Sequence, residues 1–193
     1  MIEKKRITKE TNISVGMNIY GTGLSDINTG ISFFDHMLTS FSKHSFIDLN
    51  VSCVGDIDVD YHHSVEDCGI VIGELIRSSV YPVVGLERFG FCNMIMDDAC
   101  VECSIDLSNR TFLVFDTPLS NKVLVSANFD CELVEEFFKA LVFNANICTH
   151  IIFKRGNNLH HIMEAIFKSF AVALRRALVK NNADIIPSTK GVL

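Results

Sequence analysis

Two short histidine-rich motifs carry the residue types in this sequence that are best suited to metal chemistry. They are His62-His63-Ser64-Val65-Glu66 and His160-His161-Ile162-Met163-Glu164, and both follow the pattern HHxxE. The first begins at position 62 and the second at position 160, so the copies lie 98 positions apart in a chain of 193 residues. Imidazole and carboxylate together suit a divalent ion such as manganese, iron or zinc. A five-residue pattern found twice predicts a duplicated metal site.

Each motif opens an apolar helical pattern, which places its side chains on defined faces. Positions i and i+4 share one face of a helix, so His62 can bind an ion together with Glu66. The same geometry applies to His160 and Glu164. The second histidine of each motif lies roughly 100° round the helix from the first. We expect that second histidine to serve a different ion, or to reach another subunit.

The elements that must position these motifs follow from hydrophobic periodicity and turn signals. A loop is expected over residues 21–30. Expected strands cover residues 6–12, 14–20, 47–54, 89–96, 100–107, 111–115, 123–129 and 147–153, and expected helices cover 31–43, 62 to about 80, 131–144 and 160–180. The acidic segment 55–61 is expected to be a solvated strand face, because it lacks the glycine and final glutamate of a calcium loop.

The order of these elements repeats along the chain. At an offset of 100 positions, Asp35-His36 corresponds to Glu135-Glu136, and Asn50 corresponds to His150. The boundary falls near Pro82 to Arg88. Helices with one apolar face need a partner layer. We therefore expect an α+β fold of two similar halves packed on each other, with the helices between or beside the sheets.

The composition excludes several classes of protein. A net charge of −6 without a long charge run argues against a nucleic-acid partner. No apolar run approaches the length of a membrane span, and no hydrophobic segment follows the first residues as in a signal peptide. Seven scattered cysteines do not form a disulfide framework. These features favour a cytoplasmic protein.

Several stretches together resemble the imidazoleglycerol-phosphate dehydratase family. They extend from the first quarter of the chain to its last residue: Gly21-Thr22-Gly23, Phe34-Asp35-His36-Met37-Leu38, His62-His63-Ser64-Val65-Glu66-Asp67, Arg88-Phe89-Gly90, Asp106-Leu107-Ser108-Asn109-Arg110, His160-His161-Ile162-Met163-Glu164-Ala165 and Pro187-Ser188-Thr189-Lys190-Gly191-Val192-Leu193. Two positions depart from the family pattern, Asn109 in place of a usual glycine and Tyr61 in place of a common aspartate.

The resemblance implies a fold, an activity and a set of partners. The fold would be one domain, residues 1–193, built of two homologous halves (about 1–86 and 87–193), each with a four-stranded sheet and two helices, like domain 2 of ribosomal protein S5. The activity would be a hydro-lyase reaction of histidine biosynthesis, the dehydration of imidazole-glycerol phosphate to imidazole-acetol phosphate. The cofactors would be two Mn²⁺ ions per active site, with the sites lying between subunits of a homo-oligomeric 24-mer.

The resemblance also implies roles for particular residues. The metal ligands would be His36, His62, His63, Glu66, His150, His160, His161 and Glu164, which gives three histidines and one glutamate for each ion. The substrate would be bound by Glu10, Arg88, Arg110, Lys168, Ser188, Thr189 and Lys190. Arginine fits a phosphate with two parallel hydrogen bonds and lysine attracts it as a point charge.

The expected reaction has one difficult step, the loss of a hydrogen from C2 of the glycerol chain, where no neighbouring carbonyl makes it acidic. If both ring nitrogens bind metal, the ring becomes an imidazolate that can expel the C3 hydroxyl and give a diazafulvene, which acidifies C2. A carboxylate then removes the proton. Glu10, Glu66 and Glu164 are the candidates, and the sequence does not decide among them.

Two other functions fit part of the pattern. A metal-storage assembly would use the HHxxE helices but would not need the basic residues Arg88, Arg110, Lys168 and Lys190. A metallohydrolase would keep one metal position open to water while substrate is bound. His150, on its own, would be interpreted as a core histidine in an apolar strand, and only the resemblance makes it a ligand.

Overall fold

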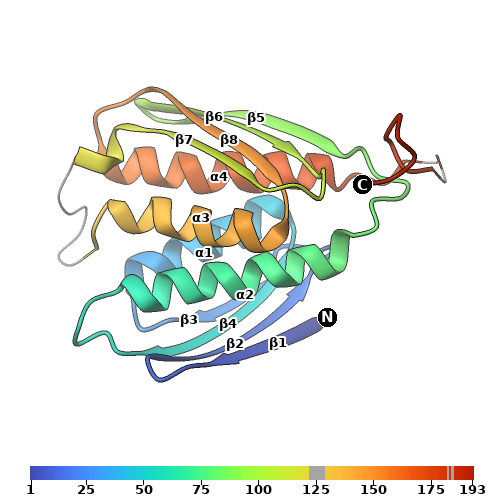
Figure 1. The fold of residues 1–193 in the computed structure, drawn as a ribbon. Coiled ribbons are helices and arrows are strands. Elements are labelled where there is room, and N and C mark those ends of the chain that lie inside the picture. Colours follow the sequence, from blue (N-terminus) through green and yellow to red (C-terminus); the bar gives the residue numbers. More distant parts are fainter. Residues whose placement is uncertain (122–128, 182, 184) are drawn as a thin grey trace.

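Two four-stranded sheets enclose four helices in the part of the chain that the structure describes (Figure 1). The structure is a computed structural model, and it describes residues 1–121, 129–181, 183 and 185–193. One sheet forms the lower layer of Figure 1 and the other the upper layer, with the helices between them. The expected α+β class, with two four-stranded sheets and two helices for each sheet, is confirmed, and both sheets are mixed.

The first sheet and its helices come from residues before Tyr81. The elements are β1 (Ile2–Ile7), β2 (Thr11–Asn18), β3 (Ser25–Asn28), α1 (Ser32–Ser45), β4 (Asp48–Gly55) and α2 (His62–Val80). The strands lie in the order β1-β2-β4-β3. β2 is antiparallel to both of its neighbours, whereas β3 runs parallel to β4 and is connected to it through α1.

The second sheet repeats this topology. Its elements are β5 (Phe89–Met96), β6 (Ala99–Asp106), β7 (Phe112–Asp116), a 3-10 turn (Pro118–Asn121), α3 (Glu132–Ala145), β8 (Cys148–Arg155) and α4 (Leu159–Ala177). The strand order is β5-β6-β8-β7, again with one parallel pair, β7 and β8. The structure thus shows the same arrangement of elements twice along the chain.

Helix pairing across the two sheets builds the core. α1 packs on α4, and α2 packs on α3. The large buried side chains are mainly phenylalanines of the helices, among them Phe34, Phe137 and Phe170. α2 approaches α3 closely through two glycines, since a Cβ atom at Gly69 would lie 2.7 Å from the carbonyl oxygen of Phe137 and one at Gly73 would collide with that of Leu141.

All four helices begin at one end of the molecule and finish at the other (Figure 1). Side-chain contacts agree with this direction: His36 and His160 meet at the beginnings of α1 and α4, and Arg175 donates to the carbonyl of His44 near their ends. Both HHxxE motifs therefore lie at the same end, on the first turns of α2 and α4. The described helices include none with the length and hydropathy of a membrane span.

Some predicted elements were wrong. The first strand covers Ile2–Ile7 rather than 6–12, and residues 8–10 form the turn that follows it. β3 lies inside the expected loop 21–30, because a polar four-residue edge strand gives no hydrophobic pattern. Residues 56–60 form a turn rather than a strand face. Most of the strand expected over 123–129 lies outside the described residues, and α4 ends at Ala177 rather than near 180.

Candidate metal centre and phosphate-binding cavity

The second HHxxE motif meets α1 in a compact group of possible metal ligands. His160 Nε2 lies 3.2 Å from Glu164 Oε2, as expected for positions i and i+4, and His36 Nε2 lies 3.8 Å from the same oxygen. One ligand atom from each of the three residues falls within 4.8 Å of the others. Among the described residues this is the one such group of three histidine, cysteine or acidic side chains. Its donors fit a divalent ion such as manganese, iron or zinc.

Glu164 is the most constrained member of this group. Only 10% of its side chain is exposed, and its second oxygen, Oε1, lies 2.7 Å from Lys168 Nζ. Burial favours the neutral acid, but the Lys168 ammonium and the neighbouring His36 and His160 more than offset this effect and hold the pKa of Glu164 below its usual value. The carboxylate is therefore ionised and ready to bind a cation at neutral pH.

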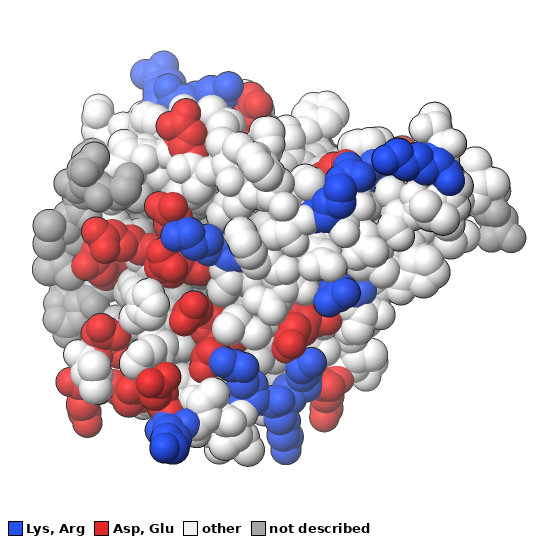
Figure 2. All heavy atoms as spheres, in the orientation of Figure 1, with Lys and Arg blue, Asp and Glu red and all other residues white. Residues whose placement is uncertain are grey.

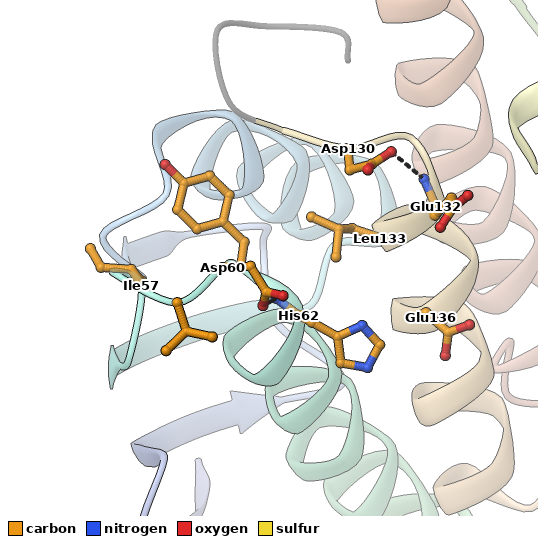
Figure 3. A pocket seen from close by; sticks show the side chains of 9 residues that line it. Ile57, Asp60, His62, Asp130, Glu132, Leu133 and Glu136 are labelled. Carbon is orange, nitrogen blue, oxygen red and sulfur yellow. Dashed lines mark hydrogen bonds between the residues drawn. The ribbon is translucent and has the colours of Figure 1, made fainter. Parts of the chain in front are cut away.

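The first HHxxE motif has different surroundings. His62 Nε2 lies 3.9 Å from Glu66 Oε2, and 43% of each side chain is exposed. His62 and Glu136 lie on opposite walls of a cavity of about 490 Å³ between α2 and α3 (Figure 3). Glu136 stands at the position that corresponds to His36 in the repeat. The same cavity is lined by Asp60, Asp130 and Glu132, so it is acidic.

The second histidine of each motif is held by a carboxylate behind its ring. His63 Nδ1 lies 3.0 Å from Asp56 Oδ2, and this hydrogen bond is the largest cause of a raised His63 pKa. His161 Nδ1 lies 2.7 Å from Asp98 Oδ1. Hydrogen bonds from the Asn157 backbone, then from His161, lower the Asp98 pKa. In both cases Nε2 faces away from the carboxylate that binds Nδ1.

A further carboxylate faces Nε2 of each of these histidines. Glu10, in the turn between β1 and β2, places Oε2 3.8 Å from His63 Nε2. Asp97, in the turn between β5 and β6, places Oδ2 3.7 Å from His161 Nε2. Asp97 is thus the structural counterpart of Glu10. The sequence analysis missed Asp97 and Asp98, because they lie in a turn that only the fold brings beside a motif, and it assigned Asp56 to a solvated strand face rather than to His63.

The turn that carries Glu10 is fastened to α2. Thr8 Oγ1 accepts hydrogen bonds from the backbone N–H groups of Glu10 and Thr11, at 3.1 and 2.9 Å. Thr11 Oγ1 donates to Asp67, the residue after Glu66, and Arg6 Nε donates to the same carboxylate at 2.8 Å. These bonds fix the turn relative to the first HHxxE motif.

Three of the four predicted basic residues, Arg88, Arg110 and Lys190, gather at the opposite end of the molecule. Arg88 Nε and Nη2 lie 2.7 and 3.2 Å from the two oxygens of Asp106, and its Nη1 donates to the Pro187 carbonyl. Arg110 is largely exposed. An open cavity of about 810 Å³ is lined by Arg88, Ser108, Asn109, Arg110 and tail residues including Ser188, Thr189 and Lys190. Figure 2 shows Lys and Arg side chains near the tail and acidic side chains over the helix beginnings.

Two predicted residues lie away from the group of side chains to which each was assigned. Lys168 lies in the middle of α4 beside Glu164 rather than in the tail cavity. His150 is exposed on β8, with its ring centroid 6.2 Å from that of Phe112, so it is not a core histidine. Of the eight predicted metal ligands, one chain therefore brings together His36, His160 and Glu164, and pairs His62 with Glu66.

Comparison with known proteins connects these features to a family. The fold and the side-chain groups define an α+β protein with a candidate metal centre and a separate basic cavity that suits a phosphate. A sequence profile described as "Imidazoleglycerol-phosphate dehydratase" matches residues 29–174. Proteins of that name from Campylobacter hominis and Sulfurimonas denitrificans are 60% and 58% identical over 193 residues, and each match covers 100% of both chains.

Solved structures agree with the sequence relatives. The imidazoleglycerol-phosphate dehydratase of Staphylococcus aureus N315 matches with a TM-score of 0.81 and 40% identity, covering 94% of this chain and 100% of that one. The Pyrococcus furiosus structure, a complex with (S)-C348, matches with a TM-score of 0.83 and 36% identity, covering 98% and 100%. The chain belongs to the imidazoleglycerol-phosphate dehydratase family. Its activity is that of an imidazoleglycerol-phosphate dehydratase, a hydro-lyase of histidine biosynthesis.

Proposed function

We propose that this enzyme dehydrates imidazole-glycerol phosphate to imidazole-acetol phosphate with two Mn²⁺ ions in each active site, and that each site is built from more than one chain. The proposed ligands are the six histidines and two glutamates predicted from the sequence. The proposed phosphate-binding residues are Arg88, Arg110, Lys168, Ser188, Thr189 and Lys190. We treat residues 1–193 as one domain of two halves, about 1–86 and 87–193, that acts in the cytoplasm.

The observation that carries this proposal is the distance between the metal end and the phosphate end of one chain. His160 lies at the beginning of α4, and the backbone N–H of Arg88 donates to the carbonyl of Ala177 at its end. These 17 residues correspond to about 26 Å of helix. A substrate with one ring, three carbons and a phosphate spans on the order of 10 Å, given ordinary bond lengths. The metal end and the phosphate end of a single chain therefore lie too far apart to bind the ring and the phosphate of the same substrate molecule.

The position of His150 supports a second chain as the source of the missing ligands. Cys148 pairs with Asp106, the partner of Arg88, and His150 lies two residues further along β8, or about 7 Å. His150 thus belongs to the phosphate end, although it is a proposed metal ligand. The row of the sheet that holds His150 also holds Ser104 and Phe91, and the Phe91 side chain is 70% exposed. A large exposed apolar side chain beside a proposed ligand suits burial against another copy.

The side chains have separable chemical roles in this proposal. When bound, the manganese ions supply Lewis acidity that stabilises the negative charge of the substrate's imidazole ring. The basic residues orient the substrate through its phosphate, so that binding energy at the remote group holds the reacting carbon in place. Loss of the hydroxyl beside the ring and of the C2 proton then gives an enol, which becomes the ketone. Glu10, Glu66 and Glu164 are the proposed proton acceptors.

The activity is tested by an absorbance assay for the enol-ketone product, with imidazole-glycerol phosphate as substrate. Metal-free protein should be inactive, and added Mn²⁺ should restore turnover. Product formation by the metal-free protein at the same rate would contradict the metal-dependent part of the proposal. Hydrolytic release of phosphate instead of ketone would favour a metallohydrolase.

The shared site is tested by mixing two inactive variants. His160→Ala damages the metal end, and Arg110→Ala damages the phosphate end of a chain. If the site is shared, random mixing of the two variants during assembly should give about a quarter of the sites with both ends intact. Restored turnover is the expected result, with each variant mixed with itself as the control. If the mixture stays as inactive as its components, each site lies within one chain.

A further inference from the structure

The two HHxxE motifs share a feature that the proposed ligand set does not use, a carboxylate behind Nδ1 of the second histidine. Asp56 holds His63 and Asp98 holds His161, at 3.0 and 2.7 Å. Neither aspartate lies in the motif itself. Asp56 comes from the turn after β4, and Asp98 comes from the hairpin turn between β5 and β6, 63 residues before His161.

A neutral imidazole carries one proton, so the partner of one nitrogen decides the state of the other. An ionised carboxylate only accepts hydrogen bonds, and a carboxylate at Nδ1 therefore places the proton on Nδ1. Nε2 is left with a free lone pair, which is the form that binds a metal ion. We infer that Asp56 and Asp98 are positioning residues that fix this tautomer of His63 and His161, and that they present Nε2 as the ligand atom. This inference rests on the proposed metal-binding role of the two histidines.

The two aspartates differ in the hydrogen bonds that their carboxylate oxygens accept. Asp98 Oδ2 accepts the backbone N–H groups of Asn157 and Asn158, at 2.6 and 3.2 Å, so only Oδ1 is left for His161. Both oxygens of Asp56 lie near His63 Nδ1, at 3.2 and 3.0 Å, and neither accepts a backbone N–H from a described residue. Rotation of the Asp98 carboxylate that exchanges its two oxygens would therefore break two hydrogen bonds, whereas the same rotation of Asp56 would break no backbone hydrogen bond.

This difference makes asparagine a sharper probe than alanine at position 98. In Asp98→Asn the amide oxygen should keep the two backbone N–H groups, which turns the NH₂ group toward His161. Nδ1 must then accept a hydrogen bond, the proton moves to Nε2, and the metal-binding lone pair is lost. In Asp98→Ala no donor faces Nδ1, and water can accept its proton. A purely structural role predicts the reverse order, because asparagine keeps the backbone bonds that alanine loses.

The test is a titration of metal-free, full-length protein with Mn²⁺, in which the EPR signal of the free ion gives affinity and stoichiometry. We expect Asp98→Ala to weaken binding roughly tenfold and Asp98→Asn roughly a hundredfold, the span typical for residues that orient metal ligands. Thermal stability should follow the opposite order, with Asp98→Asn melting above Asp98→Ala. Asp58→Asn and Asp58→Ala are the controls, since Asp58 is exposed and has no hydrogen bond or ion pair with any described residue.

The outcomes separate this inference from the proposed function. Asp98→Asn binding Mn²⁺ as tightly as Asp98→Ala, or more tightly, overturns the tautomer role even if the wild type binds metal and is active. A wild type that binds no Mn²⁺ overturns both proposals. If the Asp98 variants do not fold, the Asp56 pair decides: Asp56→Ala should bind roughly tenfold more weakly than Asp58→Ala, with Asp56→Asn between them. Equal affinities of Asp56→Ala and Asp58→Ala would refute the inference.

Discussion

The two copies of HHxxE share a sequence pattern but not an environment. On α4, Glu164 is nearly buried. Its Oε2 faces His36 and His160, and its Oε1 forms an ion pair with Lys168. On α2, Glu66 is 43% exposed, and among the described residues its ion-pair partner is His62. The neighbouring helices explain the contrast: α1 presents His36 to the copy on α4, whereas α3 presents Glu136 to the copy on α2. One copy is thus largely assembled within its own chain, and the other is left incomplete.

The largest effect should follow from removing the residue that distinguishes the α4 copy. His36→Ala deletes one of three converging donors, and we expect kcat to fall at least 1,000-fold, about 4 kcal/mol in the barrier. Steady-state kinetics with added Mn²⁺ would measure it. His44→Ala, on the same helix but outside the group of three ligands, is the control. A loss below tenfold for His36→Ala would remove the α1–α4 group from the active site.

The close packing beside the α2 copy predicts a loss of stability. Gly73→Ala pushes a methyl group against the Leu141 carbonyl of α3, and overpacking of this kind costs about 2 kcal/mol. The melting temperature should fall by about 4–8 °C. Ala171→Gly is the matched substitution at the equivalent position of α4. It should lower the free energy of unfolding by about 1 kcal/mol, because glycine has a lower helix propensity than alanine. Calorimetry that gave a stable Gly73→Ala variant would show that α2 can shift away from α3.

The two glutamates should differ in kinetics, because one asymmetric substrate cannot use both in the same way. Gln keeps the size of the side chain and removes its charge and basicity. We expect Glu164→Gln to lower kcat at least tenfold more than Glu66→Gln does, which corresponds to about 1.4 kcal/mol. Measurements at saturating Mn²⁺ separate this effect from weaker metal binding. Equal losses would make both glutamates simple ligands and would favour Glu10 as the base.

The smallest expected effect concerns the lysine that only the α4 copy possesses. Lys168 is replaced by Ile70 at the equivalent position of α2. Lys168→Met removes the charge that pairs with Glu164 and should lower kcat/KM about tenfold, or about 1.4 kcal/mol. Ile70→Met should change kcat/KM by less than about twofold. The two variants compare the same substitution at matched positions, so similar values for both would argue against a role for Lys168.

The sequence predicted those parts of the fold that depend on local patterns. β5 has the predicted limits, because exposed residues alternate with buried or half-buried ones along its whole length. Both HHxxE helices were predicted, and so was the i, i+4 pairing of His160 with Glu164. The edge strand β3 was not, since its pairing with β4 depends on the tertiary fold rather than on its own polar residues.

The candidate site shows the same division between local and tertiary information. The role of His36 as a neighbour of Glu164 could not be derived from spacing, because it depends on α1 packing against the helix of the other half. Asp98 meets His161 across 63 positions for a similar reason. The prediction of His36 and His150 as ligands came only from the resemblance to a family. Only the fold shows that the two residues lie at opposite ends of the folded molecule.

The position of His150 restricts the symmetry of any assembly that shares these sites. The surface that offers His150 is the outer face of a sheet near the ends of the helices, and the surface that would receive it is formed by the helix beginnings. A twofold axis can pair these unlike patches only reciprocally, with each chain both offering its His150 and receiving that of the other. Head-to-tail association must either close into a ring or continue as a filament. A finite enzyme built in this way is therefore either a reciprocal twofold pair or a closed ring of chains.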